Sequence, residues 1–71
     1  MNERQLAAVL EDLKPRVSDM SKPIRTQLDS LSTIEVITSV ESEINRFLSD
    51  EETERLLSTS VNNLIGFLNS I

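Results

Sequence analysis

The sequence predicts an all-α protein, a compact bundle of three to four short helices that is completed by homodimerisation. Apolar residues recur at three- and four-residue intervals along most of the chain, which is the period of an amphipathic helix. Three capping boxes mark helix starts. The 71 residues include neither cysteine nor histidine, so self-association is the stabilising device left to so small a core. We expect a single domain over residues 1–71, with helices at 3–14, 22–31, 33–48 and 50–70.

The first helix, over residues 3–14, is predicted to begin with Asn2 as its cap and Gln5 closing a capping box. A narrow apolar stripe follows, made of Leu6, Val9, Leu10 and Leu13. We expect Pro15 to end the helix near Lys14, because proline has no amide proton and crowds the preceding turn. The alternative is a bent helix, since the apolar spacing continues for a turn beyond the proline.

The second helix, over residues 22–31, is expected to have Ser21 as its cap and Pro23 in its first turn, where proline is tolerated. Its apolar residues are Ile24, Leu28 and Leu31. No glycine or proline separates it from the third helix, so residues 22–48 could also form one helix.

The third helix, over residues 33–48, is expected to begin at a capping box formed by Ser32 and Glu35. Its apolar residues are Ile34, Ile37, Val40, Ile44, Phe47 and Leu48. The many β-branched residues at 33–40 favour a strand. We prefer a helix, because the three- and four-residue spacing continues as far as Phe47.

The last helix, over residues 50–70, is predicted to begin at a third capping box, Ser49 with Glu52. On a helical wheel its apolar residues fill nearly half the circumference, whereas one contact requires a stripe of only about 100°. The helix is therefore expected to contact two neighbours and to carry a dimer interface. The interface residues are Leu57, Val61, Leu64, Leu68 and Ile71. Gly66 on its polar face marks either a close approach by another helix or a tolerated surface glycine.

The net charge of −5 is unevenly distributed along the chain. Residues 1–28 carry five bases and four acids, whereas residues 29–71 carry two bases and eight acids. The basic cluster consists of Lys14, Arg16, Lys22 and Arg25. It could contact phosphate, but no aromatic residue lies beside it to stack on bases. We prefer the interpretation that these charges offset acidic helices of the same chain or of a partner chain.

Several chemistries lack the residues they need. Without cysteine or histidine there is no thiolate or imidazole metal site, and a serine nucleophile would lack its usual base. The single glycine excludes a glycine-rich phosphate loop. The acidic residues 50–54 lack the glycine of a calcium loop and are typical of a helix start, where negative charge is favoured. We therefore expect no enzyme activity, no cofactor and no metal.

The function predicted from the sequence is protein–protein interaction by a small acidic regulator or inhibitor. Its partner-binding surface is expected to consist of Glu35, Glu43, Glu51 and Glu54. The expected partners are a second copy of the chain and another protein, for which a basic nucleic-acid-binding protein is a candidate. One alternative is a nucleic-acid-associated dimer that uses the basic cluster, and another is a structural helical adaptor. The polar start and the lack of any run of ~20 apolar residues predict a cytoplasmic protein without direct membrane or nucleic-acid binding.

Overall fold

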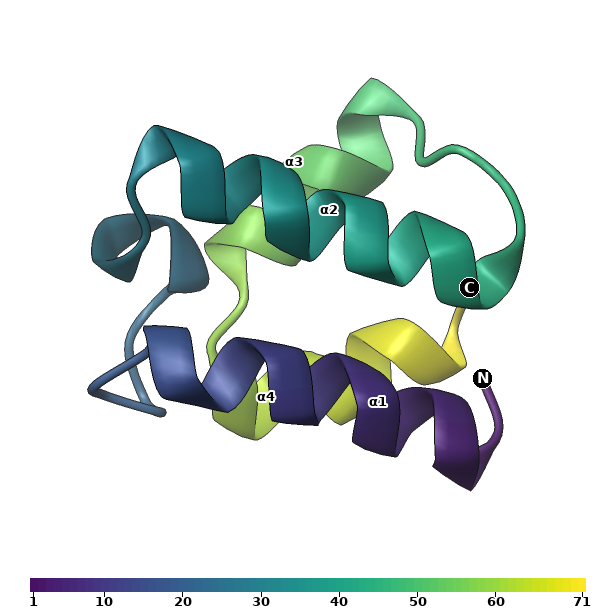
Figure 1. Ribbon diagram of the computed structural model, residues 1–71, viewed down its shortest axis with the longest axis horizontal. Coiled ribbons are helices and arrows are strands. Elements are labelled where there is room, and N and C mark those ends of the chain that lie inside the picture. Colours follow the sequence, from purple (N-terminus) through teal and green to yellow (C-terminus); the bar gives the residue numbers. More distant parts are fainter.

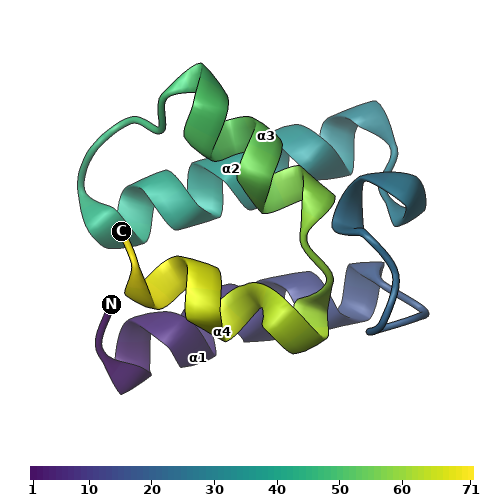
Figure 2. The same ribbon diagram turned by 180° about the vertical axis from the view of Figure 1, so that it is seen from behind.

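Four α-helices form the framework of the computed structural model, which describes residues 1–71. They are α1 (Glu3–Leu13), α2 (Ser30–Ile44), α3 (Asp50–Ser58) and α4 (Val61–Asn69). Helices α1 and α2 pack side by side and run in opposite directions, and α3 and α4 form a second layer behind them (Figures 1 and 2). The predicted all-α class is confirmed. None of the helices is long and apolar enough to cross a bilayer.

The core lies between the two layers and takes side chains from every helix. Its buried apolar residues are Val9, Leu13, Val17, Ile24, Val36, Val40, Leu56, Val61, Leu64, Phe67 and Leu68. Val17 and Ile24 belong to the connection between α1 and α2, so this connection is part of the core. Full burial of one such side chain is worth about 1.5–3 kcal/mol, and these contacts therefore outweigh any single surface interaction.

Two of the three predicted capping boxes are confirmed. At the start of α1 the Asn2 side chain accepts a hydrogen bond from the Gln5 amide at 2.9 Å, and the Gln5 side chain accepts one from the Asn2 amide at 3.0 Å. Ser49 and Glu52 make the same reciprocal pair at the start of α3, with distances of 2.9 and 3.1 Å. The local pattern fixes both starts because it satisfies amides that the helix leaves unpaired.

The capping box predicted at Ser32 and Glu35 is wrong. Helix α2 begins earlier, and Asp29 is its cap, with a side-chain oxygen 2.7 Å from the Ser32 amide. The Thr33 hydroxyl also donates to the Asp29 carbonyl at 2.8 Å. Aspartate is at least as good a cap as serine, so the earlier cap defines the start. The strand considered for residues 33–40 does not form, because α2 runs through it.

The second predicted helix, over residues 22–31, is also wrong. Only a 3₁₀ turn forms, at Ile24–Gln27, and the chain is extended at Leu28. The Gln27 side chain accepts from the Asp19 amide at 2.7 Å and donates to the Asp19 carbonyl at the same distance. These two bonds hold the loop that precedes the 3₁₀ turn.

Proline and asparagine decide where the first two long helices end. Helix α1 stops at Leu13 and is followed by a 3₁₀ turn, Lys14–Arg16, so the break predicted near Lys14 is confirmed. Helix α2 stops at Ile44, four residues before the predicted end. Asn45 follows in the left-handed conformation with φ of 59°, a geometry that asparagine tolerates and that commonly ends helices.

The single helix predicted over residues 50–70 is wrong, because Thr59 and Ser60 are extended and separate α3 from α4. The Thr59 hydroxyl donates to the Arg55 carbonyl at 2.7 Å, and its own carbonyl accepts from the Ile24 amide at 3.0 Å. Close by, the Asn62 amide donates to the Met20 carbonyl at 3.0 Å. Serine and threonine side chains compete with helical hydrogen bonds. Here the connection between α1 and α2 supplies hydrogen-bond partners for the backbone groups of Thr59 and Asn62.

Candidate partner-binding surface

Ion pairs within the chain engage half of the residues predicted for partner binding. Arg16 lies 2.6 Å from Glu35 and 3.2 Å from Asp12, and Arg25 pairs with Glu54. The carboxylate of Glu35 is the main cause that raises the pKa of Arg16 above its ordinary value. Two members of the basic cluster therefore offset acids of the same chain, as the preferred interpretation stated. Lys14 and Lys22, the other two members, are exposed and form no ion pair.

The other two predicted acidic residues lie in different surroundings. Glu51 is exposed in the first turn of α3. Glu43 is half-buried on α2, and its carbonyl accepts from the Gln5 side chain at 2.6 Å. The four predicted carboxylates therefore differ in exposure and in pairing, and their joint role in partner binding stays a prediction.

The residues predicted to form a dimer interface contribute to the core of the single chain. Val61, Leu64 and Leu68 are buried, and Leu57 and Ile71 are half-buried against the same cluster. Contact with a second copy through the first three would require this core to open. Homodimerisation itself stays a prediction.

Gly66 has open space where a Cβ atom would be, so no other helix of this chain approaches it. Within the chain it is a tolerated surface glycine.

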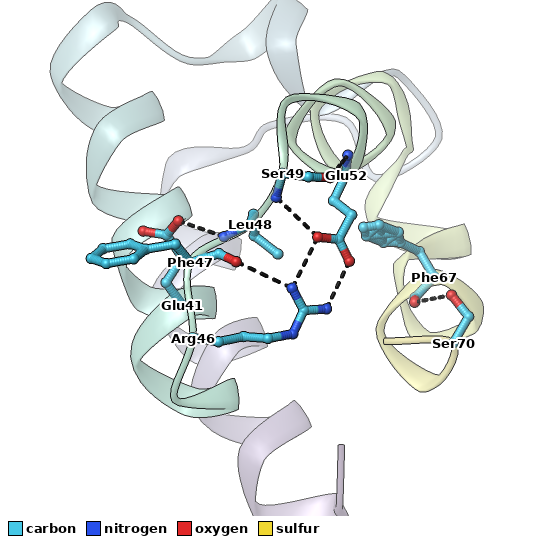
Figure 3. A network of polar contacts seen from close by, with 8 residues as sticks. All are labelled: Glu41, Arg46, Phe47, Leu48, Ser49, Glu52, Phe67 and Ser70. Atoms are coloured by element: carbon cyan, nitrogen blue, oxygen red, sulfur yellow. Dashed lines mark hydrogen bonds and ion pairs between the residues drawn. The ribbon is translucent and has the colours of Figure 1, made fainter.

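A network of polar contacts holds the loop between α2 and α3, residues 45–49 (Figure 3). The Arg46 guanidinium binds both carboxylate oxygens of Glu52, at 2.9 and 2.7 Å, and donates to the Phe47 carbonyl at 3.1 Å. From the other side, Glu41 of α2 accepts from the Leu48 amide at 2.8 Å. The loop is thus tied to the end of α2 and to the start of α3.

Glu52 is the residue on which this network converges. Hydrogen bonds from the Arg46 side chain, and next from the Ser49 amide, lower its pKa from 4.5 to about 2. The carboxylate therefore stays ionised over the whole range in which the protein would work. In the same interaction the Glu52 carboxylate raises the pKa of Arg46.

The held loop directs one aromatic side chain into solvent. Phe47 is 87% exposed, whereas the neighbouring Leu48 is half-buried against the core. The only other aromatic residue, Phe67, is 7% exposed. Burial of a phenylalanine side chain is worth about 1.5–3 kcal/mol, and at Phe47 the folded chain leaves most of this free energy unused.

The outer face of α2 continues this apolar surface. Four of its six exposed residues fall within an arc of about 80° when each residue advances by about 100°. They are Leu31, Ile34, Thr38 and Ser42, and the exposed Asn45 follows directly after the helix. Leu31 and Ile34 are 66% and 61% exposed. We call these five residues together with Phe47 the α2 outer face.

A shallow groove of about 340 Å³ joins Phe47 to the second half of α2. Its lining residues are Thr38, Glu41, Ser42, Asn45, Arg46 and Phe47. The groove offers an aromatic wall, short hydroxyl and amide side chains, the Glu41 carboxylate, and the Arg46 guanidinium, which is paired with Glu52. It is open to solvent and suited to receive side chains of another molecule. Nowhere in the chain do three histidine, cysteine, aspartate or glutamate side chains gather in a way that could hold a metal ion.

No family model, curated protein or solved structure matches this chain. The sequence reasoning missed Phe47, Leu31 and Ile34 as surface residues, because helical spacing assigned them to buried stripes. Asn45 was the residue that could have revealed Phe47, since asparagine is common just past a helix end.

Proposed function

We propose that this protein is a small non-enzymatic regulator or inhibitor that acts by binding another protein. The observation that carries the proposal is Phe47, which is 87% exposed on a loop that polar contacts hold in place. In the predicted mode the acidic helical surface binds the partner. The structure supports a modified version in which Phe47 is the anchor and Glu41, which has no ion-pair partner, lines the groove beside it.

The way the loop is held favours a binding role. Aromatic residues are enriched in protein interfaces, where they fill pockets of the partner. Ordering a flexible loop on binding costs about 0.5–1.5 kcal/mol for each immobilised side chain. Arg46, Glu52 and Glu41 have already ordered this loop, so less of that cost remains at the moment of association.

The charges around Phe47 favour a basic partner protein. Arg46 is paired with Glu52, whereas the other acidic residues near the loop have no ion-pair partner. These unpaired residues are Glu41, Glu43, Asp50 and Glu51. Complementary charge speeds association and rejects acidic competitors. Direct binding of nucleic acid has weaker support, because Arg16 and Arg25 are engaged by carboxylates of the chain.

Affinity purification from the native host, with mass spectrometry of the co-purifying proteins, tests the proposal. The wild type is compared with Phe47→Ser and with Ile65→Ser, a control on α4 that is 47% exposed. We expect a protein that is retained by the wild type and by Ile65→Ser and lost with Phe47→Ser. Equal recovery with all three forms would show that Phe47 is not the anchor.

A further inference from the structure

We infer that the partner presents a basic amphipathic α-helix of about four turns, which lies along the α2 outer face with its apolar stripe between Ile34 and Phe47. This inference rests on the proposed function and specifies the binding segment. Its starting point is the position of the exposed large apolar residues. Three of the four, namely Leu31, Ile34 and Phe47, lie on the α2 outer face.

The backbone of the protein favours a helical segment over an extended one. The chain has no β-strand, and its one isolated bridge, Pro23 with Ser60, lies inside the fold. The backbone groups along α2 are paired within that helix. An extended peptide gains affinity by adding hydrogen bonds to an exposed sheet edge, and no such edge exists here. A helix satisfies its own backbone and can bind through side chains alone.

The shape of the α2 outer face also fits a helix. Leu31 and Ile34 project near one end, and Phe47 projects at the other. Thr38 and Ser42 between them are short, and they line the groove of about 340 Å³. A partner helix can therefore approach the middle of α2 while its larger side chains contact the two ends. Because the 15 residues of α2 span roughly 22 Å, a helix of about four turns covers the face.

Charge complementarity indicates that this helix is basic, above all near Phe47. Glu35 flanks the face beside Leu31, but it is paired with Arg16. Glu41, which lines the groove with Phe47, has no cationic partner in the chain. A lysine or arginine placed there would meet both the Glu41 carboxylate and the face of the Phe47 ring, and an aromatic face attracts cations.

A second copy of the chain fits the face less well. Each copy carries a net charge of −5, and a symmetric pair would bring two such surfaces together. The one cation of the groove, Arg46, is already paired with Glu52, so the Glu41 carboxylate of each copy would lose water without gaining a free cation, which is unfavourable. A separate basic helix removes that conflict.

The test uses the full chain, labelled with ¹⁵N, and two synthetic amphipathic peptides of about 16 residues. Both have the same leucine and alanine positions, and lysine occupies the polar positions of one and glutamate those of the other. Titrations are followed by chemical shifts at ~150 mM salt, where exposed charges further apart than about 8 Å are screened. We expect shifts concentrated on the α2 outer face with the lysine peptide and none with the glutamate peptide.

Variants locate the contact. Phe47→Ser and Ile34→Ser should each weaken binding of the lysine peptide at least tenfold, whereas Ile65→Ser should leave it unchanged. Shifts spread over α3 and α4, or equal binding by all variants, would overturn the inference. So would self-association of the protein alone that Phe47→Ser abolishes in analytical ultracentrifugation, because a second copy would then occupy the face.

The two proposals fail in different ways. If the native partner depends on Phe47 but the lysine peptide perturbs another region, the function stands and the helical binding mode is wrong. If the peptide binds the α2 outer face but no native protein depends on Phe47, the proposed function fails although the face prefers a basic helix.

Discussion

The two connections on either side of α3 differ in what holds them and in what they expose. Between α3 and α4, the Thr59 carbonyl accepts a hydrogen bond from the Ile24 amide, which lies in the connection between α1 and α2. The neighbouring Ser60 is buried. Between α2 and α3, the loop is held by side chains, through Arg46 with its ion pair to Glu52 and through Glu41. The connection between α3 and α4 closes the core, whereas the loop between α2 and α3 presents an aromatic residue to solvent.

This difference separates the residues needed for folding from those available for binding. Backbone bonds between segments far apart in sequence form only when the whole fold forms, and they lie beside buried side chains. Ion pairs near the surface contribute little to stability, because water screens them and the side chains lose freedom. The Arg46–Glu52 pair is therefore expected to contribute little to the stability of the fold, although it holds the loop in place.

The largest effect is expected at Ile24, whose amide donates to Thr59 in the connection between α3 and α4. Ile24 is fully buried, and replacing it with alanine should lower the free energy of unfolding by about 2–5 kcal/mol. Ile34→Ala is the matched control, because Ile34 is 61% exposed and should change stability by less than about 0.5 kcal/mol. Urea unfolding followed by circular dichroism measures both. Similar losses in the two variants would contradict the assignment of Ile24 to the core.

A smaller effect is expected from the serines that precede α3 and α4. Ser49 accepts a hydrogen bond from the Glu52 amide, and Ser49→Ala should cost about 0.5–2 kcal/mol. The Ser60 hydroxyl makes no such cap bond and accepts only from the side chain of the exposed Asn63, so Ser60→Ala should cost clearly less. The two melts are compared in urea. A larger loss at Ser60 would mean that the buried connection depends on its hydroxyl.

The sequence was sufficient where a local pattern decides the structure. Helical spacing predicted the all-α class, two capping boxes located the starts of α1 and α3, and Pro15 located the end of α1. Each of these features needs only residues within about one helical turn, and no distant contact competes with it.

The sequence was insufficient where distant segments decide the structure. The break at Thr59 needs the Ile24 amide as a partner, and spacing alone gives no information about that contact. The apolar arc of nearly 180° was interpreted as two contacts of one helix. It instead belongs to two short helices that pack separately on the core, so the premise for a dimer through Leu64 disappears. In hindsight Ser58, Thr59 and Ser60 form a gap in the stripe.

The candidate site was predicted only in part. Composition predicted that the site is acidic and that the basic cluster offsets acidic helices. It did not reveal that Glu35 and Glu54 form ion pairs with Arg16 and Arg25. Phe47 was placed in a buried stripe because a wheel drawn past Ile44 assumes that the helix continues. Asn45 ends it, and every residue beyond then leaves the helical phase.

The surface ion pair of the loop should appear in the acid dependence of stability. The pKa of Glu52 is about 2 in the folded protein against an ordinary 4.5, so its contribution is fully present above about pH 4.5 and disappears as the pH falls towards 2. Glu52→Gln keeps an oxygen acceptor for the Ser49 amide but removes the charge. The stability difference between wild type and variant should therefore be largest near neutral pH and vanish near pH 2. A difference that does not change with pH would show that the ion pair with Arg46 is not formed.

The smallest effect on stability, with the largest effect on binding, is expected at Phe47. At 87% exposure the ring transfers little area from water when the chain folds, so Phe47→Ser should change the free energy of unfolding by no more than about 0.5 kcal/mol. The backbone of the loop should also keep its position, because Arg46 binds the Phe47 carbonyl and Glu41 binds the Leu48 amide, and neither contact uses the ring. Unchanged melts and unchanged circular dichroism would thus accompany the loss of partner binding. A loss of more than about 1 kcal/mol would instead show that the ring packs on the chain, in which case the loop between α2 and α3 would resemble the buried connection and Phe47 would be a poor anchor.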